Sequence, residues 1–183
     1  MLLVFDTETN GFKNSHIVQL AAILYDNEKE VQVYNSLVKP TDWTIPDEVV
    51  KIHGITTERA LAEGQPIETV LDAFLELARQ AERFVAHNFK FDRTIVDGEI
   101  SRRYRDPQTG HSVYHSPFGA KAYHCTMLQA TSICRLPGKY GYKWPTLQEA
   151  HTILVGHPFE SAHDALADVR ACKAVYDKLT ERK

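Results

Sequence analysis

The sequence is poor in cysteine and has no excess of positive charge. Its three cysteines, Cys125, Cys134 and Cys172, show no paired spacing, which favours reduced thiols and argues against a disulfide framework. The net charge of −3 argues against binding nucleic acid by electrostatics alone. Bound metal ions or local basic loops can still supply positive charge where it is needed, so enzymes acting on nucleic acid are not excluded.

Long hydrophobic runs, internal repeats and low-complexity tracts are also missing. The apolar residues 2–5 stop at Asp6 with no basic segment before them, so no signal peptide is visible, and nothing approaches the length of a membrane span. We therefore expect a cytoplasmic protein. With 183 residues, 43% of them hydrophobic, we expect residues 1–183 to form a single domain with a substantial core.

Strand patterns dominate the first forty residues. The runs 2–5, 16–25 and 30–38 are rich in apolar and β-branched residues, and residues 26–27 (Asp-Asn) are a turn signal. These runs predict an antiparallel three-strand meander. A further short strand is expected at 84–86.

Helical patterns dominate the remainder. The clearest is 66–81, where apolar residues recur at helical spacing. Other helices are expected over residues 46–54, 56–64, 91–103, 127–134, 146–154 and 165–179. Strands followed by alternating helices and strands predict an α/β domain, with a mixed sheet flanked by helices on both faces.

Three acidic segments coincide with the ends of these elements. Asp6 and Glu8 follow the first strand and, being two apart, point to the same face of it while Thr7 turns away. Asp92 lies at a strand-to-helix corner, where the helix dipole favours an acid. Solvated strand ends and simple helix caps are the alternative interpretations of these acids.

His163 and Asp168 stand at the start of the last predicted helix. Within a regular helix, five residues separate side chains by about 140°, so both face one cleft only if His163 precedes the helix. A histidine there is suited to take a proton from water at neutral pH. A surface histidine at a helix start is the alternative.

Taken together, these residues predict a metal site. Carboxylates held close together raise one another's pKa unless cations neutralise them. Hard oxygen ligands suit Mg²⁺ or Mn²⁺ better than zinc. We therefore expect a site for two divalent cations.

The strings FDTETNG, HNFKFD and HDALAD occur in this order, with HGIT between the first and second. In these motifs the sequence resembles the DEDDh branch of the 3′–5′ exonucleases, the superfamily of the proofreading subunits of DNA polymerases, over roughly residues 2–176. The resemblance implies a ribonuclease H-like fold with a mixed five-stranded sheet, and His163 as the general base. It also implies two metal ions, Mg²⁺ or Mn²⁺, held by Asp6, Glu8, Asp92 and Asp168.

The resemblance further implies a pocket for the terminal nucleotide beside the first motif. Phe12 is a candidate for stacking on a base, and Ile55 is a candidate wedge between the last two bases. The residues that match substrate-contacting positions are Thr9, Asn10, Gly11, Phe12, Ile55 and Asn88.

Two further segments, 101–123 and 139–144, mix cations with aromatic residues, which suits single-stranded nucleic acid as well as a solvated excursion. The expected activity is metal-dependent removal of 5′-mononucleotides from the 3′ end of DNA, single-stranded or frayed. Trimming of short RNA or RNA 3′ tails and a catalytically silent nucleic-acid-binding module are the alternatives. A polymerase or another nucleic-acid machine is a candidate partner.

Overall fold

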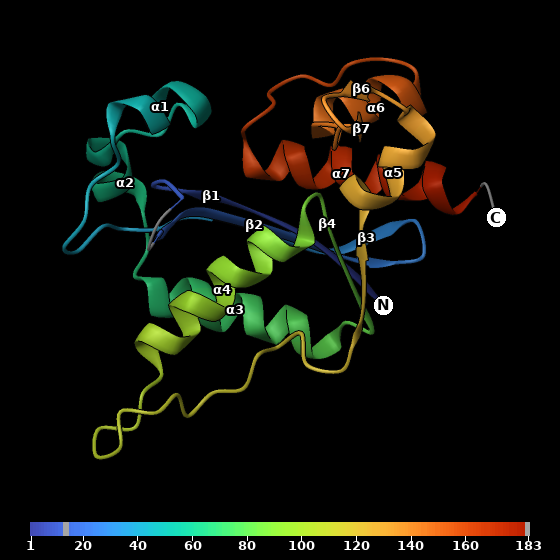
Figure 1. The fold of residues 1–183 in the computed structure, drawn as a ribbon. Coiled ribbons are helices and arrows are strands. Elements are labelled where there is room, and N and C mark those ends of the chain that lie inside the picture. Colours follow the sequence, from blue (N-terminus) through green and yellow to red (C-terminus); the bar gives the residue numbers. More distant parts are fainter. Residues whose placement is uncertain (13–14, 182–183) are drawn as a thin grey trace.

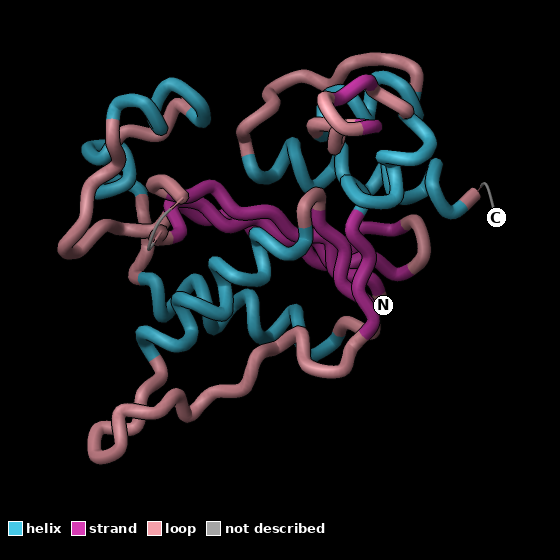
Figure 2. Tube along the Cα trace, in the orientation of Figure 1, coloured by secondary structure: helices cyan, strands magenta, loops and turns pink. Residues whose placement is uncertain are grey.

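A five-stranded mixed sheet forms the centre of the computed structural model, which describes residues 1–12 and 15–181 (Figures 1 and 2). The strands are β1 (Leu2–Thr9), β2 (Ile17–Asp26), β3 (Lys29–Leu37), β4 (Arg83–Ala86) and β5 (Ala122–Cys125). Their order across the sheet is β3-β2-β1-β4-β5. β1, β2 and β3 pair antiparallel, whereas β4 runs parallel to β1 and β5 parallel to β4. The predicted meander and mixed sheet are confirmed.

Two strands differ from the sequence pattern. The pattern ended the first strand at Asp6, but β1 continues to Thr9 because Asp6, Thr7 and Glu8 pair with residues 19–21 of β2. The two acids therefore stand on a hydrogen-bonded strand and not on a loop. β5 was not recognised from its residues, because this short edge strand is half-buried or exposed and carries no apolar run.

Helices cover both faces of the sheet. The helices of the described residues are α1 (Asp47–His53), α2 (Thr57–Glu63), α3 (Ile67–Gln80), α4 (Phe89–Arg103), α5 (Thr126–Cys134), α6 (Leu147–Val155) and α7 (Ala165–Thr180). α3 and α4 pack on one face and α7 on the other, with α5 and α6 beside α7 (Figure 1). Every predicted helix is present, although α4 begins two residues earlier than expected. Within the described residues, no helix combines the length and apolarity needed to cross a bilayer.

The segment between α4 and β5 contributes to the hydrophobic core. Neither interpretation of residues 101–123, a surface for single-stranded nucleic acid or a solvated excursion, included such a role. Phe118 is 2% exposed, and its ring centroid lies 5.4 Å from that of Phe5 and 4.9 Å from that of Phe84. Lys121 Nζ donates to the carbonyl of Ala78, at 2.7 Å, near the end of α3. Part of this segment's aromatic and cationic character thus stabilises the fold.

Residues 137–142 form a small hairpin of β6 (Pro137–Gly138) and β7 (Gly141–Tyr142) on the α7 side of the molecule (Figure 1). Its aromatic residues are exposed: Tyr140 is 90% and Tyr142 55% accessible, and Trp144, just beyond the hairpin, is 64% accessible. The segment between α4 and β5 extends on the opposite side, next to α3 and α4. Most of the two segments therefore lies on different sides of the molecule, and only their ends meet, where Tyr123 and Trp144 line one pocket.

Candidate active site

The carboxyl end of β1 carries the first two acids. Asp6 and Glu8 project from alternate positions, and both line a pocket of about 190 Å³. Thr7 between them does not simply turn away, because its backbone N–H and its hydroxyl both donate to Asp92 Oδ1, at 3.1 and 2.8 Å. Sequence reasoning missed this role of Thr7, which is visible only when β1 and α4 are placed side by side.

Asp92 lies in the first turn of α4 and is only 2% exposed. The chain reaches α4 from β4 through Asn88, whose φ of +73° lies in the left-handed region that asparagine tolerates better than most residues. This sharp corner directs Asp92 toward β1. The side chain of Asn88 makes no capping hydrogen bond to α4 and lines the pocket instead.

His163 and Asp168 complete the pocket. His163 precedes α7 with a φ of +70°, and Asp168 lies in the first turn, the arrangement that their spacing required. The backbone N–H of His163 donates to Asp168 Oδ2 at 3.2 Å, which fixes the loop on the helix. The exposed imidazole can offer a ring nitrogen such that ligand atoms of Glu8, His163 and Asp168 all lie within 4.8 Å of one another.

The four acids and the histidine predicted from the sequence all line this one pocket, which we call the catalytic pocket. The residues around it are Asp6, Thr7, Glu8, His87, Asn88, Phe91, Asp92, Leu147, His163 and Asp168. They come from β1, the β4–α4 corner, α6 and the start of α7. The pocket is therefore assembled from segments that are distant in the sequence.

The acids raise one another's pKa. Burial, followed by the charges of Asp92, Asp168 and Glu8, raises the pKa of Asp6 well above its usual value. Burial and the neighbouring Asp168 raise the pKa of Glu8 to about 8. Burial raises the pKa of Asp92 to about 7 although the bonds from Thr7 oppose it, and burial raises that of Asp168 to about 6.

Such a cluster fits divalent cations. Four carboxylates share one pocket, and the pKa of each is raised there, because burial without nearby positive charge disfavours the charged form. A cation with hard oxygen preference removes that penalty and takes carboxylate oxygens as ligands. The donor set thus matches Mg²⁺ or Mn²⁺, with Asp6, Glu8, Asp92 and Asp168 as the residues that would hold them.

His87 supports the corner from behind. Its Nε2 donates to the carbonyl of Pro145 at 3.0 Å, and its Nδ1 accepts from Thr126 Oγ1 at 2.9 Å. Burial lowers the pKa of His87, which keeps the ring neutral and compatible with one donor and one acceptor nitrogen. The end of β4, the start of α5 and the chain before α6 are thereby tied together.

A second pocket of about 190 Å³ lies beside the catalytic pocket, and we call it the terminal pocket. Its residues are Thr7, Glu8, Thr9, Gly11, Phe12, Val49, Ile52, His53 and Phe91. Phe12 is 88% exposed, and its ring lies 6.3 Å from that of Phe91. Thr9, Gly11 and Phe12 thus border a cavity, as the resemblance implied.

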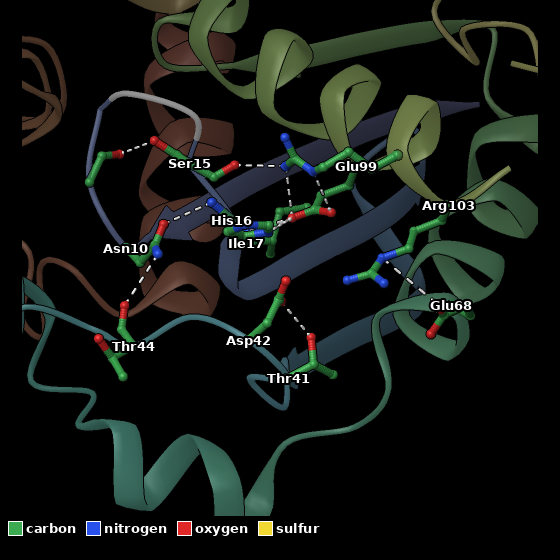
Figure 3. A network of polar contacts seen from close by, with 12 residues as sticks. Asn10, Ser15, His16, Ile17, Thr41, Asp42, Thr44, Glu68, Glu99 and Arg103 are labelled. Carbon is green, nitrogen blue, oxygen red and sulfur yellow. Dashed lines mark hydrogen bonds and ion pairs between the residues drawn. The ribbon is translucent and has the colours of Figure 1, made fainter. Parts of the chain in front are cut away.

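The side chain of Asn10 stabilises the local fold. Its Nδ2 donates to the carbonyl of Thr44 at 3.2 Å, and its Oδ1 accepts the backbone N–H of His16 at 2.8 Å (Figure 3). Both ends of the amide are therefore engaged, and Asn10 does not line the terminal pocket.

Glu99 anchors the chain that enters β2. This side chain is 1% exposed, and its carboxylate meets His16 Nδ1 at 3.0 Å and accepts the backbone N–H of Ile17 at 3.3 Å (Figure 3). Arg102 donates to Glu99 at 3.2 Å and to the carbonyl of Ser15 at 2.7 Å. The network fixes residues 15–17 on α4, next to the chain that borders the terminal pocket.

The prediction that Ile55 acts as a wedge between bases is wrong. Its side chain is 2% exposed and packs in a cluster with Val18 and Ile45, so it cannot act as a wedge between bases. Ile52, three residues earlier in α1, is 49% exposed and lines the terminal pocket. His53 of the motif therefore lines the terminal pocket together with Ile52, which precedes the motif, whereas Ile55 of the motif packs in the core.

The sheet order, the antiparallel meander and the helices on both faces define a ribonuclease H-like fold. The chain matches the RNase_T exonuclease family over residues 3–176, so it belongs to that family and the resemblance indicated by the motifs is confirmed. No curated protein matches the chain.

Solved structures of exonuclease I are similar to the chain. One is E. coli exonuclease I in complex with a dT13 oligonucleotide, with 22% identity, a TM-score of 0.76, and coverage of 98% of this chain and 40% of that chain. The zinc-ion-bound form of an E. coli exonuclease I–single-stranded DNA complex has 23% identity, a TM-score of 0.76 and coverage of 100% and 40%.

A moderately thermophilic exonuclease I from Methylocaldum szegediense has 24% identity, a TM-score of 0.72 and coverage of 100% and 40%. At these identities the likeness establishes the fold. The chain spans about 40% of the length of these proteins.

Proposed function

We propose that the chain is a metal-dependent 3′–5′ exonuclease that removes 5′-mononucleotides from the 3′ end of single-stranded or frayed DNA. The observation that carries the proposal is the convergence of Asp6, Glu8, Asp92, His163 and Asp168 on one pocket. Membership of the exonuclease family and the oligonucleotides bound by the exonuclease I relatives support it. Residues 1–183 act as one exonuclease domain in this proposal.

The residues of the catalytic pocket have separate roles in this proposal. Asp6, Glu8, Asp92 and Asp168 hold two divalent cations, which when bound activate water and stabilise the leaving oxygen. His163, exposed at the mouth of the pocket, takes a proton from the attacking water. Thr7 keeps Asp92 in place, and the hydrogen bond from the His163 backbone does the same for Asp168.

The terminal pocket gives the reaction its direction. It shares Thr7, Glu8 and Phe91 with the catalytic pocket, so a nucleotide held in it places its 5′ phosphate next to the acids. Phe12 stacks on the terminal base, and the backbone of Thr9 and Gly11 meets the 3′ hydroxyl. Asn88 contacts the strand on the other side of the acids. Hydrolysis then releases the terminal nucleotide with its 5′ phosphate.

A degradation assay tests the proposal. The purified chain with Mn²⁺ or Mg²⁺ is given a single-stranded DNA labelled at its 5′ end, the same sequence as RNA, and a mismatched duplex. We expect a ladder of shortened DNA strands and free 5′-mononucleotides. A strand with a blocked 3′ end and a circular single strand are expected to resist.

The assay also separates the alternatives. Faster loss of the RNA than of the DNA would replace the DNA substrate by RNA and leave the mechanism intact. Cutting of the circle would contradict the exonuclease, and binding of all strands without hydrolysis would identify a silent binding module. Asp26→Asn, an exposed acid at the far end of β2, is the control for the acidic substitutions described below.

A further inference from the structure

A larger cavity lies on the other side of the catalytic pocket, with a volume of about 390 Å³. This size is within the range of binding sites for small molecules or single residues of a polymer. Its walls come from the start of α4, from β5, from α5 and from the chain that follows β7. Its principal side chains are Lys90, Arg93, Tyr123, Met127, Leu128 and Trp144. We call it the Tyr123–Trp144 pocket.

Large apolar side chains are exposed in this pocket. Tyr123 is 62%, Leu128 54% and Trp144 64% accessible. The ring of Tyr123 is held by stacking on the buried Phe89, at 4.6 Å between centroids and 10° between planes. A fixed ring with most of its surface in water is a ready partner for another flat group, and exposed apolar patches of this kind commonly mark binding sites.

Positive charge lies beside the rings. Lys90 makes no ion pair within the described part of the chain. Arg93 pairs through Nε with Asp97 at 3.3 Å, and its two terminal nitrogens make no hydrogen bond to residues 1–12 or 15–181. Cations next to exposed aromatic rings are complementary to a strand whose phosphates are negative and whose bases have flat faces.

The pocket continues directly from the catalytic pocket. Asn88 lines both, whereas the terminal pocket and the Tyr123–Trp144 pocket share no residue. The catalytic pocket therefore lies between them. His87, next to Asn88, holds the carbonyl of Pro145, so the chain that carries Trp144 is tied to the catalytic corner.

We infer that the Tyr123–Trp144 pocket binds an unpaired nucleotide on the 5′ side of the scissile phosphodiester, with the base on Tyr123 and Trp144 and the phosphates near Lys90 and Arg93. The inference rests on the proposed function, because the terminal nucleotide must occupy the opposite pocket. A base within a duplex is covered by its neighbours, so this pocket selects single-stranded or frayed ends.

Fluorescence of Trp144 tests the inference. The chain has two tryptophans, and Trp43→Phe leaves Trp144 as the only one. A decathymidylate with phosphorothioate linkages, which resist hydrolysis, is added with Mn²⁺ present. We expect quenching of Trp144 that follows strand binding measured by anisotropy of a labelled strand. Thymidine 5′-monophosphate at the same nucleotide concentration is expected to leave the emission unchanged.

Affinity measurements on the natural tryptophan background give an independent test. Tyr123→Ala and Trp144→Ala should each weaken strand binding about tenfold, which corresponds to about 1.4 kcal/mol. Tyr140→Ala is the matched control, since Tyr140 is an exposed aromatic residue of the hairpin that precedes Trp144 and does not line the pocket. It should change the affinity less than twofold.

The inference is overturned if the strand does not bind, if it binds without quenching Trp144, or if Tyr140→Ala weakens binding as much as Tyr123→Ala. Binding without quenching would show that the strand lies outside this pocket. Release of mononucleotides from an unmodified strand is measured in parallel. Quenching without release would refute the proposed hydrolysis and keep this pocket, whereas release without quenching would do the reverse.

Discussion

The catalytic pocket and the Tyr123–Trp144 pocket share a wall at Asn88 but are built in opposite ways. The first is small and acidic, and Asp92 and Asp168 are 2% and 8% exposed on regular elements. The second is larger, carries cations, and presents aromatic rings that are more than half exposed. Chemistry requires groups held in place and partly removed from water, whereas capture of a strand requires surface that the strand can reach.

The two pockets also differ in how they depend on metal ions. Without cations the acids offer a phosphate no attraction, whereas Lys90 and Arg93 attract it in either state. Substitutions in the two pockets should therefore affect different quantities, hydrolysis in one and affinity in the other. Four predictions about the catalytic pocket test this difference, from the largest expected effect to the smallest.

Asp6→Asn should lower the rate of hydrolysis by about 10⁴-fold, because metal ions contribute several kcal/mol to the stabilisation of the transition state and each 1.36 kcal/mol is a factor of ten. The rate is measured at saturating Mn²⁺ by release of mononucleotides, with Asp26→Asn as the control. A variant that kept more than a tenth of the activity would show that Asp6 is not a ligand, and the division between the pockets would fail.

His163→Ala should lower kcat by about 10²–10⁴-fold, the usual contribution of a general base. Strand affinity should change little, because the imidazole is exposed at the mouth and lies outside the Tyr123–Trp144 pocket. His111→Ala, on the exposed segment between α4 and β5, is the control. If His163→Ala instead raised KM and left kcat intact, His163 would be a substrate contact and not the base.

Thr7→Val should lower activity about 10–100-fold, the range found when a residue that orients a metal ligand is replaced. It removes the hydroxyl bond to Asp92 and leaves the backbone bond in place. Thr7→Ser retains the hydroxyl and should be close to the wild type. Equal activity of the Val and Ser variants would mean that the backbone N–H alone positions Asp92.

The metal-free protein should lose stability as the pH rises from about 5 to 8.5. Glu8, Asp92 and Asp168 have folded-state pKa values of about 8, 7 and 6, above their usual values, so the folded state binds more protons than the unfolded state in this range. Protonation therefore stabilises the fold at low pH, and this stabilisation is lost as the pH rises through those values. Thermal unfolding with EDTA measures it.

The expected loss is at least about 1 kcal/mol, or 2–4 °C for a chain of this size. Saturating Mn²⁺ should remove the loss at pH 8, since an ion that binds only the folded state stabilises it. Asp6→Asn should flatten the metal-free pH profile. A melting temperature that rises with pH under EDTA would show that the acids are not crowded together.

Most of the secondary structure could be predicted from sequence, because long amphipathic stretches such as α3 carry a strong periodic signal. The features that the sequence pattern did not predict have physical causes. β5 is a short edge strand without an apolar run, and β1 is longer than predicted because pairing with β2 overrides the polar character of Asp6 and Glu8. Phe118 could not be assigned to the core, because its partners Phe5 and Phe84 come from other segments.

The sequence by itself determined the element end at which each of the four acids and His163 stands, and the family to which their motifs belong. These features are local, since a strand alternates its faces and a helix start favours an acid. Only the tertiary structure decided that Thr7 holds Asp92, that Ile55 is buried while Ile52 faces the terminal pocket, and that Tyr123 and Trp144 line one cavity. Each of these depends on contacts between distant segments, which local patterns do not record.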